Sequence, residues 1–450
     1  MLSLYPDHSE TIEGTGEALR AGSTTCAKVL QKCLDRIEEW EPKVKAWVVI
    51  DREGAKEQAR ILDEELARGD CRGPLHGIPF GIKDIIDVKG LPTACGFGPW
   101  RDRIAAEDAD VVEYLRDAGA VIPGKTVTTQ FAWIDPPVTR NPWNLERTPG
   151  GSSSGSAAAV ATGMCLGAIG TQTGGSIIRP ASFCGVSGYK PAHRSMNSRE
   201  GILPFAPSFD DLGPIARTVS DIRLIAEAIL RIHTGPTRMF ESVEQLKSKE
   251  LDPRPASPKL SRPRGFFDRR ADPEMLAAFE TALSVLERAG AEVIDFDDAS
   301  IDCESILSRH RTMMAAEAAT SHEERFAVHG EHYSKHIRAL IEDGLKIPAT
   351  RYIAARDDWT DNSVFSKIFV TPAAIGPAPD LSTTGNPCMN SPFSYLGSGV
   401  ISFPIALSSQ GMPLAIQLAG HDRDFADRGL LATAAWCESA IRRAFSAGSD

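Results

Sequence analysis

The alternation of short apolar segments with helix-like segments restricts the fold of this chain more than any other feature of its sequence. The apolar runs at 77–86, 120–123 and 166–170 are as short as buried strands, whereas 109–118 and 157–164 have the composition of helices. Strands and helices that alternate in this way form a sheet whose faces the helices cover. The sequence therefore predicts an α/β fold with a buried sheet.

The flanking regions continue this pattern with longer helices. The polar, proline-rich stretch 233–263 predicts a connection across the surface, and the short basic run from Arg262 to Arg270 is interpreted as a solvated part of it. The region 24–69 is predicted to be helical, with a break at Pro42 and a second helical run at 53–68. The other predicted elements are helices at 221–232, 273–289, 303–358 and 425–445, and strands at 291–296, 364–373, 400–407 and 413–418.

Composition and charge argue against several classes of protein. The 450 residues carry a formal net charge of −11, whereas nucleic acids and anionic membranes attract clustered Lys and Arg. The least polar stretch, 157–170, is too short to span a bilayer. Residues 1–9 lack the basic and apolar regions of a secretory signal. The nine cysteines are scattered without a Cys-x-x-Cys pair, so we expect a reduced, cytoplasmic protein without a metal site.

The first of three motifs places a lysine inside an apolar strand. Lys83 lies in the run 77–86, Gly-Ile-Pro-Phe-Gly-Ile-Lys-Asp-Ile-Ile. Burial lowers the pKa of a lysine, so the neutral amine becomes available as a base. The alternative is a lysine whose ammonium group reaches the surface on its aliphatic stem. The motif alone leaves both interpretations open.

Two further motifs are rich in glycine and serine. The run 149–156, Pro-Gly-Gly-Ser-Ser-Ser-Gly-Ser, is not a phosphate-binding loop, because no lysine follows its last glycine. It leads into an apolar helix and so belongs inside a domain, not in a linker. The run 170–180, Gly-Thr-Gln-Thr-Gly-Gly-Ser-Ile-Ile-Arg-Pro, has two glycines before Ser176. These glycines let backbone N–H groups converge as in an oxyanion hole, or they mark an ordinary turn after a strand.

Together the three motifs resemble the amidase signature family. Ser152 and Ser176 are separated by the family's spacing, and the lysine strand lies upstream of both. Segments 183–191, 211–214 and 411–420 extend the resemblance over nearly the whole chain. The resemblance implies a mixed β-sheet sandwiched between layers of α-helices. It also implies one domain over 1–450, with N-terminal helices at 1–70, a catalytic core at 71–220 and a second half at 265–450 that covers the substrate pocket.

By position, the resemblance implies a relay of two serines and a lysine. Ser176 matches the nucleophile, Ser152 matches the bridging serine that follows a cis peptide bond, and Lys83 matches the base. This assignment agrees with the chemistry, because serine is a weak nucleophile until a neighbouring base takes its proton. We expect no cofactor. The oxyanion would be stabilised by the backbone N–H groups of Thr173, Gly174, Gly175 and Ser176.

The position of Arg179 distinguishes this chain from many members of the family. Those members have arginine two residues after the nucleophile, whereas Ile178 takes that place here and the arginine follows it. This order, together with Asn-Pro-Cys at 386–388, resembles the bacterial malonamidase branch. We predict that Arg179, with Gly151 and Thr171 beside it, binds a substrate carboxylate. The alternative is an arginine paired with a structural carboxylate.

The expected function is therefore hydrolysis of a small carboxamide, such as malonamate, to a carboxylate and ammonia. One alternative is the A subunit of a tRNA-dependent amidotransferase, which needs partner subunits and differs from this chain at Ile178 and Arg179. Another is an amidase or esterase for larger aryl or peptide amides, which the catalytic residues do not exclude. A non-catalytic binding protein on the same fold is disfavoured, because all three catalytic positions are filled.

The expected partner is a small-molecule amide, with no nucleic acid and no membrane, and a homodimer is the candidate assembly. His329, His332 and His336 have a spacing that would place them on one helical face. No His-Glu-x-x-His motif accompanies them, so we interpret them as a solvated face and not as metal ligands.

Overall fold

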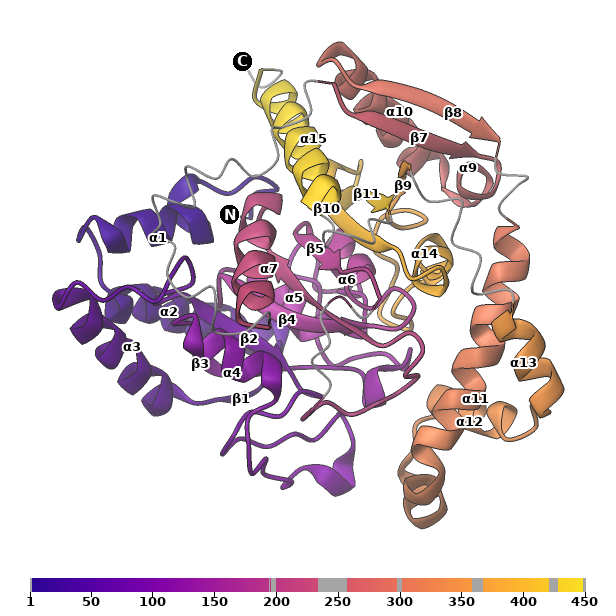
Figure 1. Ribbon diagram of the computed structural model, residues 1–450, viewed down its shortest axis with the longest axis horizontal. Coiled ribbons are helices and arrows are strands. Elements are labelled where there is room, and N and C mark those ends of the chain that lie inside the picture. Colours follow the sequence, from indigo (N-terminus) through magenta and orange to yellow (C-terminus); the bar gives the residue numbers. More distant parts are fainter. Residues whose placement is uncertain are drawn as a thin grey trace.

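A single mixed β-sheet joins the two halves of the chain (Figure 1). The computed structural model describes residues 2–193, 195, 200–233, 257–297, 302–357, 367–420 and 428–447. Within them the sheet has eleven strands in the order β1-β3-β2-β4-β6-β5-β10-β11-β9-β7-β8. The strands are β1 (Trp47–Ile50), β2 (Pro79–Lys83), β3 (Val121–Thr126), β4 (Gly167–Gln172), β5 (Ser187–Lys190), β6 (Asp211–Ala216), β7 (Lys259–Arg264), β8 (Glu292–Asp297), β9 (Ile368–Pro372), β10 (Gly399–Leu407) and β11 (Pro413–Gly420).

Two sets of helices pack on this sheet, which confirms the predicted α/β fold. α5 and α6 contact β4, β10 and β11, whereas α7 and α15 contact β5, β6 and β10. α11, α12 and α13 pack on one another at one side of the molecule (orange in Figure 1). The helices are α1 (Ile12–Arg20), α2 (Cys26–Val44), α3 (Arg52–Ala67), α4 (Asp110–Asp117), α5 (Ser154–Ala161), α6 (Ile178–Cys184), α7 (Val219–His233), α9 (Phe266–Arg270), α10 (Pro273–Arg288), α11 (Cys303–His329), α12 (Lys335–Gly344), α13 (Ala349–Asp357), α14 (Ser391–Tyr395) and α15 (Arg428–Ala447).

Helix α5 consists of small residues because it lies very close to the neighbouring backbone. All eight of its residues are buried. A Cβ added to Gly155 would come within 2.2 Å of the carbonyl oxygen of Ala46, so only glycine fits there. The helix begins at Ser154, three residues before the predicted start. The Gly/Ser run is therefore the tightly packed entry to a helix.

The structure corrects two expectations from the sequence. Pro42, predicted to break the first helix of the region 24–69, lies inside α2, which ends only where Lys45 adopts a left-handed conformation with φ of 55°. The short strand β1, which was not predicted, follows before α3. Arg262 is not solvated: it lies on β7 with a side chain 4% exposed, and it forms ion pairs with Glu280 and Asp268. The predicted connection thus ends in a strand, and its residues 234–256 lie outside the described chain.

The parallel part of the sheet determines where the three motifs meet. β2 pairs in parallel with β3 on one side and with β4 on the other. Lys83 is the last residue of β2, and Thr171 and Gln172 end β4. Ligand sites in α/β sheets form at the carboxyl ends of such strands. The lysine motif and the Gly-Gly-Ser motif are therefore brought to the same edge.

Candidate active site

Lys83 is fully buried and does not reach the surface along its stem. Its Nζ lies 2.7 Å from Oγ of Ser152. It also lies 2.8 Å from Oγ1 and 3.3 Å from the carbonyl oxygen of Thr171. Burial lowers the pKa of Lys83 well below its ordinary value, and the carboxylate of Asp210 only partly opposes this effect. The lowered pKa therefore favours the neutral amine, which is the form that accepts a proton.

Ser152 bonds this amine and precedes Ser153, whose backbone bonds the Gly-Gly-Ser loop. The Gly151–Ser152 peptide bond is cis, as the family resemblance implies. The backbone N–H of Thr129 donates to the carbonyl of Ser152 at 3.3 Å, and that of Ser153 donates to the carbonyl of Ser176 at 3.2 Å. Ser152 is fully buried, whereas Ser176 is partly exposed. A substrate can therefore approach Ser176 but not Ser152.

The loop around Ser176 presents backbone donors that the described chain does not use. Oε1 of Gln172 accepts the N–H groups of Ile177 and Ile178 at 2.9 and 3.0 Å, which satisfies the first turn of α6. Within the described ranges, the N–H groups of Gly174, Gly175 and Ser176 have no hydrogen-bond acceptor. Free N–H groups beside a serine hydroxyl can stabilise an oxyanion where they converge on one point, so an oxyanion hole at this loop stays a prediction.

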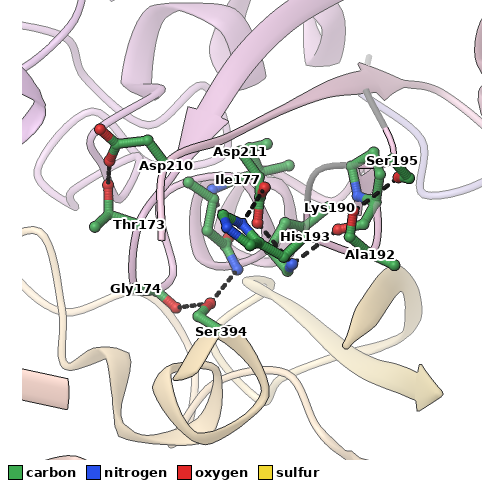
Figure 2. A network of polar contacts seen from close by, with 12 residues as sticks. Thr173, Gly174, Ile177, Lys190, Ala192, His193, Ser195, Asp210, Asp211 and Ser394 are labelled. Carbon is green, nitrogen blue, oxygen red and sulfur yellow. Dashed lines mark hydrogen bonds and ion pairs between the residues drawn. The ribbon is translucent and has the colours of Figure 1, made fainter. Parts of the chain in front are cut away.

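Residues from the second half of the chain hold this loop from outside. Nε2 of His310 lies 3.0 Å from the carbonyl oxygen of Thr173. Oγ of Ser394 donates to the carbonyl of Gly174 at 2.8 Å (Figure 2). Oγ1 of Thr173 donates to Oδ1 of Asp210 at 2.6 Å, and burial raises the pKa of that carboxyl. The loop is thus fixed through the carbonyl groups of Thr173 and Gly174 and through the side chain of Thr173.

Close packing favours glycine at the two positions before Ser176, most strongly at Gly175. A Cβ on Gly174 would lie 3.2 Å from Oγ of Ser391. A Cβ on Gly175 would lie only 2.5 Å from Oδ1 of Asn390. The residues around α14 thus approach the loop so closely that side chains at these positions would displace them. The Gly-Gly pair is explained by this contact as well as by the need for free N–H groups.

Arg179 is buried without a carboxylate partner in the described part of the chain. Its Nε donates to the carbonyl of Thr384 at 2.7 Å, and its Nη2 donates to the carbonyl of Gly151 at 2.8 Å. Its Nη1 is buried and unpaired among the described residues. Burial lowers the pKa of Arg179 to about 10, so the guanidinium remains charged at neutral pH. The structure therefore does not support the alternative of a structural ion pair.

The other predicted binding residues already have contacts within the protein. Thr171 contacts Lys83 through both its hydroxyl and its carbonyl. Gly151 accepts from Arg179. A role for either in binding substrate stays a prediction.

A second buried cluster of charges lies beside the loop but does not enter it (Figure 2). Nζ of Lys190 on β5 lies 2.9 Å from Oδ2 of Asp211 on β6, and Nδ1 of His193 lies 2.9 Å from Oδ1. Burial opposes ionisation of this carboxyl, but Lys190 and His193 outweigh it and hold the pKa of Asp211 below its usual value. The cluster fastens β5 to β6.

The three histidines of the second half lie in different elements. His329 ends α11, His332 lies in the short helix η6 (Gly330–His332), and His336 lies in α12. They therefore do not share the helical face that their spacing suggested. Among the described residues, no group of three or more His, Cys, Asp or Glu side chains is arranged to hold a metal ion.

Sequence reasoning placed the serines and the lysine but missed the groups that support them. His310, Ser394, Asn390 and Thr384 come from the second half of the chain and carry no motif of their own. His310 lies between 303 and 362, where the family resemblance is weak. Gln172 lies inside a recognised motif, shortly before the two glycines. Of these supporting residues, it is the one whose role the sequence could have indicated.

Comparison with known proteins identifies the family. The chain belongs to the Amidase family, whose model matches residues 28–367. A solved amidase is 29% identical with a TM-score of 0.82 and covers 95% of this chain and 99% of its own. The native peptide amidase from Stenotrophomonas maltophilia is 25% identical with a TM-score of 0.79, over 96% and 97% of the two chains. These comparisons confirm the predicted family and fold, but not the malonamidase branch.

A curated relative points to a different branch of the family. The A subunit of glutamyl-tRNA(Gln) amidotransferase from Roseiflexus castenholzii (strain DSM 13941 / HLO8) is 40% identical over 302 residues, which are 65% of this chain. The chain spans 60% of the length of that relative. Across the described ranges, none of the helices is long and apolar enough to cross a membrane.

Proposed function

We propose that this protein is an amidase that cleaves the C–N bond of a small carboxamide through Ser176, Ser152 and Lys83. One observation carries the proposal: a buried, desolvated lysine contacts the hydroxyl of Ser152 at 2.7 Å, in a loop bonded to the backbone of Ser176. In the part of the chain that the structure describes, no carboxylate bonds that amine. Burial of such a lysine is costly, and a catalytic base accounts for it. Family membership supports the same reaction.

The reaction follows from these contacts. Neutral Lys83 takes the proton of Ser152 while Ser152 takes the proton of Ser176, so that Oγ of Ser176 attacks the amide carbon. The resulting oxyanion lies against the free N–H groups of the loop. Ser152 then protonates the leaving nitrogen and the C–N bond breaks, which leaves an acyl-enzyme at Ser176. Water hydrolyses this ester and restores the serine.

The contacts of Arg179 favour a substrate that carries a carboxylate, such as malonamate. Its Nη1 lies 3.1 Å from the position of a Cβ on Gly175, one residue before the nucleophile. Its Nε and Nη2 are fixed by backbone carbonyls, so the guanidinium plane is held in place, and no carboxylate among the described residues bonds it. A carboxylate on the acyl side of the substrate would supply a negative charge. The substrate class is thus a primary amide with a nearby carboxylate.

The A subunit of an amidotransferase is the second candidate, because a curated relative of that kind is 40% identical to this chain. This function would require partner subunits. A third candidate is an amidase for larger amides, which the resemblance to a peptide amidase supports. The three candidates share the serine chemistry and differ in substrate and in the need for partners.

Ammonia release from a panel of amides separates these functions. Malonamate, succinamate and glutamine carry a carboxylate, whereas acetamide, benzamide and a peptide amide do not. We expect release from the first group, abolished by Ser176→Ala and retained by Ser153→Ala as the matched control. Preference for the peptide amide would favour the third candidate. Release that appears only with co-purified partner subunits would favour the amidotransferase.

A further inference from the structure

We propose that His310 and Ser394 are positioning residues that orient two oxyanion donors, the backbone N–H groups of Gly174 and Gly175. This inference rests on the proposed amide hydrolysis, and it assigns to two residues of the second half a role in that reaction. Neither residue has to touch the substrate. Each acts through a carbonyl group of the loop.

Because the peptide bond is planar, a hydrogen bond that holds a carbonyl group also sets the direction of the next residue's N–H group. In a trans peptide unit the C=O and the N–H of the next residue point in opposite directions. His310 holds the carbonyl of Thr173, so the N–H of Gly174 points away from α11. Ser394 holds the carbonyl of Gly174, so the N–H of Gly175 points away from α14. Two donors are therefore aimed to one side of the loop by two hydrogen bonds on the other side.

Glycine makes these hydrogen bonds necessary. Gly174 and Gly175 lack the side chains that restrict other residues, so their peptide planes rotate easily unless they are held. Donors that are fixed before the reaction stabilise an oxyanion far better than donors that must reorient. Around both glycines the packing is close: an added Cβ would lie 3.5 Å from the His310 ring at Gly174 and 2.5 Å from Oδ1 of Asn390 at Gly175.

The tautomer, the orientation and the charge state of His310 all suit this hydrogen bond. A carbonyl oxygen only accepts, so Nε2 carries the proton and donates it to Thr173. The ring packs edge-to-face on Phe209 with centroids 4.6 Å apart, which fixes its orientation. Burial lowers the pKa of His310 to about 4, so the imidazole is neutral at working pH and is not a charge in the site.

Ser394 is connected to the same loop from a second direction. Nε2 of Gln172 donates to Oγ of Ser394 at 3.2 Å, which leaves the hydroxyl proton directed at the carbonyl of Gly174. Oε1 of Gln172 accepts the N–H groups of Ile177 and Ile178. The side-chain amide of Gln172, which precedes the loop, thus bonds two N–H groups that follow the loop. It also bonds the Ser394 hydroxyl, which in turn bonds the carbonyl of Gly174 in the middle of the loop.

Four variants test the proposal. His310→Phe keeps the ring and its packing but removes the donor, His310→Gln keeps an N–H donor, and Ser394→Ala removes the hydroxyl. His322→Phe is the matched control, because His322 is also a buried histidine of α11 but bonds the hydroxyl of Tyr333, not the loop. Thermal unfolding of each variant identifies losses that come from destabilisation.

Two readouts are needed. The first is kcat and KM for the best amide of the panel. The second is the rate at which a fluorophosphonate modifies Ser176, which forms the P–O bond, breaks the P–F bond and releases fluoride with the proton of serine. This second rate depends on the oxyanion donors but not on knowledge of the substrate.

We expect His310→Phe and Ser394→Ala to lower kcat and the labelling rate about 10- to 100-fold with KM nearly unchanged, somewhat less than the complete loss of one donor. His310→Gln should recover most of the loss, and His322→Phe should label at the wild-type rate. Wild-type labelling in His310→Phe and Ser394→Ala would overturn the inference while leaving the proposed function intact. Wild-type protein in which Ser176 is not labelled would overturn both.

Discussion

Replacing Lys83 with methionine should remove nearly all amidase activity while leaving the protein folded. Methionine fills a similar volume, so the change deletes the amine 2.7 Å from Ser152 without opening a large cavity. A positioned general base contributes roughly 10²- to 10⁴-fold to the rate, so kcat/KM should fall by about that factor. Lys83→Arg should be equally inactive, because arginine keeps its proton at any working pH.

The same substitution has a consequence for stability that depends on pH. Burial holds the pKa of Lys83 below that of the unfolded chain, so between the two pKa values the unfolded state binds one proton more than the folded state. The stability of the wild type should therefore rise with pH by about 1.36 kcal/mol per unit in this window, up to the unfolded pKa near 10.4. Lys83→Met lacks this contribution, so its Tm relative to the wild type should decline as the pH is raised.

The assays are ammonia release across a pH series and thermal unfolding of both proteins across the same series. The wild-type kcat/KM should increase as the pH passes the lowered pKa of Lys83, because only the neutral amine accepts a proton. An active Lys83→Arg variant, or a wild-type rate that is highest when the amine is protonated, would refute the assignment of Lys83 as the base. A Tm difference that does not change with pH would refute the claim that the buried amine is neutral.

Three further changes test other parts of the structure. Arg179→Met should raise KM for malonamate about 10- to 150-fold but not for acetamide, because charged hydrogen bonds contribute roughly 1.5–3 kcal/mol. Equal losses for both amides would contradict the role of Arg179 in binding the substrate carboxylate. Lys125 and Asp84 form a buried ion pair. Lys125→Met should lower the free energy of unfolding by about 3–5 kcal/mol, because it leaves Asp84 buried without this partner. An unchanged denaturation midpoint would show that the pair is not stabilising. Burial raises the pKa of Glu438 to about 7, so the wild type should lose stability as the pH rises toward that value, because the folded protein keeps a proton that the unfolded chain has already released. Glu438→Gln should flatten that slope, and an identical Tm profile would contradict the assignment.

Much of the candidate site was readable from local sequence. The resemblance of three short motifs to the amidase signature family predicted Lys83, Ser152 and Ser176 as the reacting groups, and these roles stay predictions. Each motif can be recognised locally, because its neighbours are restricted by backbone conformation. The alternation of apolar runs and helices predicted the α/β class for a similar reason, since burial on a sheet leaves a period in the sequence. Elements with weaker patterns were missed, such as the short strand β1 inside a helical region.

The sequence by itself therefore determined the family, the fold class and the identity of the candidate nucleophile and its relay. The tertiary structure decided whether Lys83 is buried and what Arg179 contacts. It also decided that His310 and Ser394 hold the loop at Thr173 and Gly174. The physical reason is the range of the interactions. A strand or a tight loop is restricted by its neighbours in the chain, whereas a hydrogen bond between residues more than a hundred positions apart depends on how whole helices dock, and docking leaves no periodic signal in the sequence.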